Sequence, residues 1–138
     1  MRRLLLAAVL GALMAVPAVA LASTNPKEVW VTDCFSSRFQ PKLIVISCGD
    51  ASNYLDKLRW SSWSPTKAAG SGRDHVNSCT PNCAAGHSKS VRVNVTLSQP
   101  RRCRGRLHKV FDKAKLQFPG QTGRNSTQMV TLGCPLKQ

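Results

Sequence analysis

Six cysteines constrain the fold of this chain more than any other feature of its sequence. An even number of cysteines in a short exported protein indicates disulfide bonds, because thiols are oxidised outside the cytosol. Six cysteines allow fifteen pairing schemes, and their order along the chain favours bonds between neighbours. The expected bonds are Cys34–Cys48, Cys79–Cys83 and Cys103–Cys134. In the loop-entropy treatment these bonds stabilise the fold by roughly 3, 2 and 3.5–4 kcal/mol respectively.

The first 22 residues predict export through a cleaved signal peptide. Arg2 and Arg3 form a basic start, residues 4–16 are apolar, and small residues follow where a signal peptidase cuts. We expect cleavage between Ala22 and Ser23, or else directly after Ala20, and the first cut leaves one secreted domain of 116 of the 138 residues. The apolar run is short for a membrane span, and no later run is long enough. We expect a monomer, without a membrane anchor, that is extracellular or associated with the cell wall.

The charge of the chain indicates the kind of partner it prefers. The formal net charge is +14, and it falls to +12 when Arg2 and Arg3 are removed. The six acidic residues of the chain all remain, against eighteen lysines and arginines. Such an excess weakens the compact state by self-repulsion and attracts anionic partners. We therefore expect the disulfides to offset the repulsion, and the partner to be an anionic polymer or an acidic protein surface.

Short alternating segments predict an all-β domain. The clearest segment is 91–98, where apolar residues hold every second position. Further strands are expected at 28–33, at 43–46, from Leu58 to Trp63, from Val110 to 118 and at 129–132. We expect a connection at 35–40, a flexible run at 68–72 that suits a bulge or a loop, and a stapled loop at 77–87. We also expect a strand end at Pro100 and a polar loop at 121–128. Six or seven strands predict a small disulfide-stapled antiparallel barrel or sandwich.

Two of these segments also fit a helix. Leu55 and Leu58 have helical spacing, and so does the series Leu107, Val110, Phe111, Ala114 and Phe118. Serines 61, 62 and 64 are poor helix formers, and residues 113–118 alternate strictly between polar and apolar. We therefore expect strands in both places.

The segment 48–86 is expected to organise the core. It contains three cysteines, the only tyrosine (Tyr54), and two tryptophans, Trp60 and Trp63. In a small domain such aromatic residues most often form the core. The alternative is an exposed platform on which sugars or bases stack.

Four residues at intervals of four, His75, Cys79, Cys83 and His87, raise the question of a metal. Two thiolates and two imidazoles can bind zinc. Zinc ligands usually form tight pairs around a longer loop, however, and exported thiols normally become disulfides. We expect a disulfide between Cys79 and Cys83, exposed histidines, and neither a metal nor another cofactor.

A dense basic segment is the candidate binding site. Seven bases occur within fifteen residues, against Asp112 as the only acid of the segment. Alternation along a strand would place Lys113 and Lys115 on the same sheet face. Solubility alone does not require such density, so we expect a non-enzymatic protein that binds anionic polymers of the cell envelope. The predicted binding residues are Arg101, Arg102, Arg104, Arg106, Lys109, Lys113 and Lys115.

Two other functions remain as alternatives. In a small secreted nuclease or other hydrolase, His75, His87 and His108 would act as acid and base, and Lys109 would stabilise developing charge. The chain has one glutamate and no nucleophile motif, so we assign no catalytic residue. A secreted enzyme inhibitor would also fit the compact stapled shape.

The order of the motifs resembles a family of small secreted proteins from actinobacteria. The motifs are Cys48-Gly49-Asp50, the series Leu55-x-x-Leu58-x-Trp60-x-x-Trp63, and Cys79-x-Pro81-x-Cys83-Ala84-x-Gly86. The resemblance covers about residues 41–118 and implies an extracellular or wall-associated bacterial protein rich in β-structure. It implies no activity and no catalytic residue at any position of this sequence.

Overall fold

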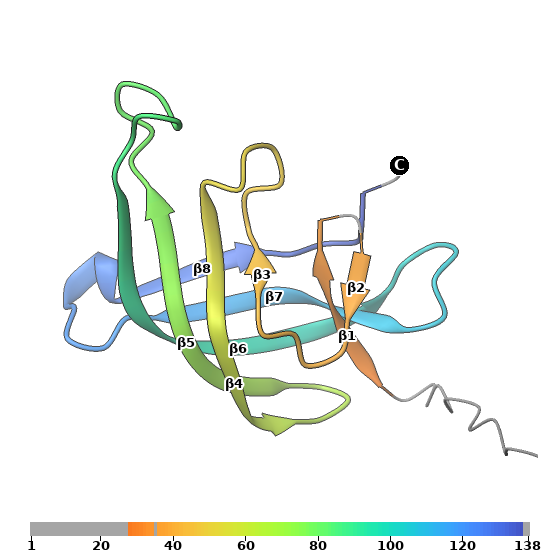
Figure 1. Cartoon of the computed structure of the whole chain (residues 1–138). Helices are drawn as coiled ribbons and strands as arrows, with labels where there is room; N and C mark the ends of the chain where they lie inside the picture. Colours follow the sequence, from red (N-terminus) through yellow and green to blue (C-terminus); the bar gives the residue numbers. More distant parts are fainter. Residues whose placement is uncertain (1–27, 35, 137–138) are drawn as a thin grey trace, which may run out of the picture.

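The computed structural model describes residues 28–34 and 36–136, which form one curled β-sheet (Figure 1). Eight strands and a short 3-10 turn make up this part of the chain, in agreement with the predicted all-β fold class. The strands are β1 (Val29–Asp33), β2 (Ser36–Arg38), β3 (Ile44–Val45), β4 (Asn53–Trp63), β5 (Ala68–Asn77), β6 (Ser88–Arg102), β7 (Lys109–Gln117) and β8 (Thr127–Thr131), and the turn η1 covers Gly123–Ser126.

The strand order makes the sheet an open barrel. Along the sheet the order is β2-β1-β7-β6-β5-β4-β3, and β8 pairs with β7 beside β1. Every pairing is antiparallel except that of β1 with β7, which is parallel and joins Val29 to Lys109 and Trp30 to Val110. Figure 1 shows β6 bending, so that its first part runs beside β5 and its second part beside β7. This bend lets one long strand belong to both walls of the barrel.

Side chains and a disulfide close the barrel where no strand ladder does. Strands β1 and β3 come together at the open edge, and the Cys34–Cys48 disulfide joins the residues that follow them. The Val45 N–H donates to Asp33 Oδ1 at 3.3 Å. The indole N–H of Trp63 on β4 donates to the Val29 carbonyl at 3.0 Å. Strand β1, which lies next to the end strand β2, is therefore fastened to β3 and β4 at the other end of the sheet by a disulfide and two hydrogen bonds.

The core draws on seven of the eight described strands, all except β2. Only three of its thirteen buried members lie in segment 48–86, so that segment supplies less of the core than expected. The other members come from β1, β3, β6, β7 and β8. The members are Val29, Val31, Ile44, Leu55, Leu58, Ala68, Val93, Val95, Leu97, Phe111, Ala114, Leu116 and Val130.

The two tryptophans of β4 pack on this core, as predicted. Trp60 and Trp63 meet edge to face, with ring centroids 4.8 Å apart, and Trp63 meets Phe111 in the same way at 5.6 Å. The Trp60 indole donates to the Pro41 carbonyl at 2.9 Å. Tyr54 is not part of this cluster, because its ring stacks on His75 on the other face of the sheet.

The run at 68–72, predicted to be flexible, is instead a regular part of β5. Strand β4 has a bulge opposite it, with a register shift between Asp56 and Arg59. The bulge brings the β4 backbone close to β5. A Cβ on Gly70 would lie 2.5 Å from the Arg59 carbonyl oxygen, and one on Gly72 would lie 2.6 Å from that of Asp56. The glycines therefore serve close packing against a bulge.

Other boundaries also differ from the prediction. Pro100 does not end β6, because the ladder is interrupted at Gln99 (φ +55°) and resumes with Pro100 opposite Phe111. The connection at 35–40 contains the short strand β2, and η1 lies in the predicted polar loop. Residues 109–117 do form a strand, as expected, because β6 and β8 pair with them on both sides.

The signal peptide, the membrane topology and the oligomeric state were also predicted from the sequence. The signal peptide predicted at 1–22 lies outside the described residues. Between residues 28 and 136, with residue 35 not described, no helix is long and apolar enough to cross a membrane. The monomeric state stays a prediction.

All three disulfides pair as expected, and each holds a different part of the fold. Cys34–Cys48 fastens the edges of the barrel, and Cys79–Cys83 closes the loop between β5 and β6. Cys103–Cys134 joins the β6–β7 hairpin to the segment after β8. That segment is also bonded to β1, because Thr32 Oγ1 donates to the Gly133 carbonyl at 2.8 Å.

We predict that the three disulfides differ in their effect on stability according to loop length. Replacing Cys103 and Cys134 by serine should lower the free energy of unfolding by about 3.5 kcal/mol, and replacing Cys79 and Cys83 by about 2 kcal/mol. Urea unfolding of the two double variants, followed by tryptophan fluorescence, measures both. A larger loss for the Cys79/Cys83 variant would contradict the loop-length argument.

Candidate functional site

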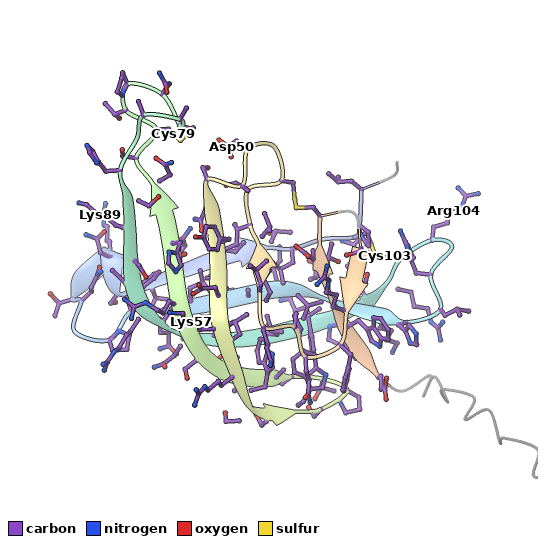
Figure 2. All side chains as sticks on the ribbon, in the orientation of Figure 1. Asp50, Lys57, Cys79, Lys89, Cys103 and Arg104 are labelled. Carbon is purple, nitrogen blue, oxygen red and sulfur yellow. A yellow bond between two sulfur atoms is a disulfide. The ribbon has the colours of Figure 1, made fainter. Side chains whose placement is uncertain are left out.

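The β6–β7 hairpin brings together four of the seven predicted binding residues. Together with Pro135 and Leu136 they surround a hollow of about 460 Å³, and the Cys103–Cys134 disulfide forms part of its wall. We call this feature the arginine hollow. Figure 2 shows Arg104 on the hairpin, projecting away from the sheet. The four residues are Arg101, Arg102, Arg104 and Arg106.

The charges of the hairpin differ in how far they are neutralised. Asp112 lies between two bases, with Oδ1 3.0 Å from Arg101 Nη1 and Oδ2 3.6 Å from Lys113 Nζ. Within the described chain, Arg102, Arg104 and Arg106 form no ion pair. Three exposed guanidinium groups therefore remain available to an anionic partner.

The three predicted lysines extend along β7. Lys109 begins the strand opposite Arg102. Lys113 and Lys115 alternate with the buried residues Ala114 and Leu116, so the two lysines share the face away from the core, as expected. They adjoin the hairpin without lining the arginine hollow.

A second basic surface lies on the outer face of β4, β5 and β6. Lys57, Arg59, Arg73 and Arg92 line a groove of about 700 Å³, here called the outer groove. Arg73 stands directly opposite Arg92, an unfavourable pairing of like charges. Arg73 Nε donates to Ser90 Oγ at 2.8 Å, which fixes its position. In Figure 2, Lys57 and Arg104 are well separated, so the outer groove and the arginine hollow are distinct.

Sequence reasoning missed the outer groove because its four bases come from three strands. Only the alternation at 91–97 placed Arg92 on an outer face in advance. The cluster depends on the register Arg73–Arg92 and on the bulge near Lys57, where φ is +51°. No sequence pattern predicts either this register or this bulge, and the four bases appear in the sequence only as isolated residues.

His75 lies in a hydrogen-bonded cluster on the outer face. Its ring stacks on Tyr54 with centroids 4.7 Å apart, and its Nε2 lies 3.0 Å from Asp56 Oδ1 and 3.3 Å from Ser90 Oγ. In a serine hydrolase triad the carboxylate and the hydroxyl use different ring nitrogens. Here both use Nε2, so the arrangement is not that of a triad.

The other two histidines have separate surroundings. His108 stacks on Trp30 beside the hairpin, with ring centroids 4.3 Å apart. His87 is exposed at the end of the 78–87 loop. None of the three histidines stacks on or bonds to another within the described residues.

The loop whose cysteine and histidine spacing raised the question of a metal site is closed by a disulfide. Cys79 and Cys83 are bonded to each other, so neither offers a thiolate to a metal. Asp50 Oδ2 lies 3.2 Å from Cys83 Sγ, but this oxidised sulfur carries no proton to donate. Asp50 Oδ1 accepts the Ser52 N–H at 3.0 Å, as its turn position predicts, and this bond lowers the pKa of Asp50.

Asp74 is the one acid buried in the described part of the chain. The residue is 3% exposed, its Oδ1 has no hydrogen-bond partner, and it lines a cavity of about 450 Å³. Burial raises the pKa of Asp74, and the nearby His75 partly opposes this. Lys89 and Arg124 line the same cavity. The alternation of β5 forces this acid inward, between Leu55 and Val91 on the neighbouring strands.

No protein-family model, curated protein or solved structure matches the chain. The resemblance to small secreted actinobacterial proteins therefore stays a prediction.

We predict that Asp74→Asn stabilises the protein at neutral pH. The raised pKa means that Asp74 favours the fold below its ordinary pKa of 3.8 and loses this contribution as the pH rises through the folded-state value. Asparagine does not ionise, so the variant should gain on the order of 1 kcal/mol at pH 7 and nothing near pH 3.

Urea unfolding at both pH values measures this difference. Asp50→Asn is a control of opposite sign, because the lowered pKa of Asp50 predicts a loss of stability at pH 7 in that variant. A loss of stability at pH 7 in Asp74→Asn would show that the carboxylate is stabilised by Lys89 or Arg124 rather than penalised by burial.

Proposed function

We propose that this protein is a secreted, non-enzymatic module that binds anionic polymers through the β6–β7 hairpin. The observation that carries the proposal is the arginine hollow. Arg102, Arg104 and Arg106 converge there without an acidic partner in the described chain. Guanidinium groups bind phosphate and carboxylate oxygens in a bidentate geometry, which suits polymers that carry repeated oxyanions.

The hairpin is held in place before any partner arrives. The Cys103–Cys134 disulfide ties it to the segment after β8, and the Leu136 N–H donates to the Cys34 carbonyl at 2.8 Å. A binding surface that is ordered in advance loses less conformational entropy on association. The disulfide and the hydrogen bond that hold the hairpin therefore favour binding by the hairpin over binding by a freely moving basic tail.

Three disulfides support the secreted location of this function. They persist in oxidising compartments, and cytosolic proteins of this size rarely carry them. The leader at 1–22 and the envelope as the place of action are parts of the same proposal. The high positive charge would concentrate the protein near anionic envelope polymers and speed association.

We expect neutralisation of the hairpin arginines to weaken polymer binding. At about 0.15 M salt, Arg102→Gln/Arg104→Gln/Arg106→Gln should bind soluble polyphosphate at least ~10-fold more weakly than the parent protein. The slope of log affinity against log salt should fall by about 2–3 as well, because three ion contacts are lost. Fluorescence anisotropy with labelled polyphosphate measures both quantities.

The matched control removes the same charge elsewhere. Lys42, Lys67 and Arg124 are exposed and lie outside the hairpin. Their triple glutamine variant should lose less than about threefold in affinity, since long-range attraction is screened beyond a Debye length. Equal losses in the two triple variants would mean that net charge alone binds the polymer, and the hairpin site would be rejected.

A further inference from the structure

A small cavity beside the hairpin is lined by three residues whose buried polar atoms lack partners. It has a volume of about 360 Å³ and is lined by Trp30, Ser37 and residues 105–108. We call it the indole cavity. Trp30 Nε1, Ser37 Oγ and His108 Nδ1 are all buried and, within the described chain, have no hydrogen-bond partner. Three of the five such side-chain atoms found there thus belong to residues that line one cavity.

The contrast with the other tryptophans makes Trp30 unusual. Trp60 and Trp63 donate their indole N–H groups to backbone carbonyls at 2.9 and 3.0 Å. A buried donor left without an acceptor destabilises the fold, because nothing compensates its loss of hydration. Three such groups around one cavity represent a cost that an occupant with acceptor atoms would remove.

The chemistry of the lining defines that occupant. The Trp30 indole and the Arg106 guanidinium can only donate hydrogen bonds, and Ser37 and His108 can donate as well. No acidic residue lines the cavity among the described residues. The site therefore matches a compact group that only accepts hydrogen bonds and carries negative charge.

The polar groups are positioned by strand pairing and ring stacking, without hydrogen bonds to one another. The parallel pairing of β1 with β7 places Trp30 opposite Val110, and the β1–β2 register places Ser37 opposite Thr32. His108 lies flat on the Trp30 ring, at an interplanar angle of 7°. The donors are thus arranged before a ligand arrives, which lowers the entropic cost of binding.

We propose that the indole cavity binds a single oxyanion, one phosphate or carboxylate group of the anionic polymer that the hairpin recognises. The proposal rests on the function proposed above and adds a specific subsite to it. Arg106 lines both the indole cavity and the arginine hollow. One polymer could therefore place an oxyanion in the cavity while adjacent charges contact Arg102 and Arg104.

The indole N–H groups report directly on this site. In the mature protein labelled with ¹⁵N-tryptophan, inorganic phosphate should shift the Trp30 Nε1–H signal in a saturable way and leave those of Trp60 and Trp63 in place. Acetate in a second titration tests the carboxylate source, and sodium chloride at equal ionic strength controls for screening. A Trp30 signal that moves with neither phosphate nor acetate, or all three signals moving together, would overturn the proposal.

Variants separate the cavity from the hairpin. Ser37→Ala should weaken phosphate binding by about 10-fold, because one hydrogen bond to a charged ligand is lost. Trp30→Phe removes the one indole donor among the described lining residues and should weaken phosphate binding by a similar factor. In this variant the His108 ring signals report the binding of phosphate or acetate. Unchanged phosphate affinity in both variants would reject the assignment of these donors.

The double variant Arg102→Gln/Arg104→Gln distinguishes the two proposals, since neither residue lines the indole cavity. If this variant loses polyphosphate binding while phosphate still shifts the Trp30 signal, the result supports both the hairpin function and the cavity subsite. Loss of polyphosphate binding in a protein whose Trp30 signal never responds to an oxyanion leaves the hairpin function standing and rejects the cavity. A phosphate-responsive Trp30 with unchanged polyphosphate binding rejects the hairpin instead.

Discussion

The fastening of the two edges of the curled sheet is the constraint on which the rest of the structure depends. Neighbouring strands β4 to β7 supply the wall, but the β1 and β3 edges meet without a ladder. The Cys34–Cys48 bond, the Asp33 carboxylate and the Trp63 indole hold them together. Without these contacts the gap between the two strands would expose the core to water. Closure therefore protects the apolar interior.

Closure also decides where the charge is placed. With the interior filled by aliphatic side chains and Phe111, the lysines and arginines occupy the outer face and the hairpin. Their mutual repulsion opposes folding, and covalent bonds that restrict the unfolded chain offset it. The same disulfide that stabilises the hairpin, Cys103–Cys134, also forms part of the arginine hollow. This one bond therefore contributes both to the stability of the hairpin and to the proposed binding surface.

The candidate site was only partly predictable. The density of bases at 101–115 identified the hairpin, because charge clustered in sequence remains clustered on a hairpin. The indole cavity could not be foreseen, since it needs Trp30 and Ser37 beside His108, and these residues are far apart in sequence. The outer groove likewise depends on strand register. In both cases side chains that bear no local pattern are brought together by pairing between distant strands.

Local chemistry along the chain was sufficient to predict the β class and the strand at 91–98, because alternation is a local property, and the order of the cysteines favoured the disulfide pairing that the structure shows. Tertiary structure alone decided that β1 pairs parallel to β7, that Gly70 and Gly72 pack against a bulge, and that Asp74 points inward. The physical reason is that each of these outcomes depends on register between strands, and register is set by the fit of the whole core rather than by any one segment.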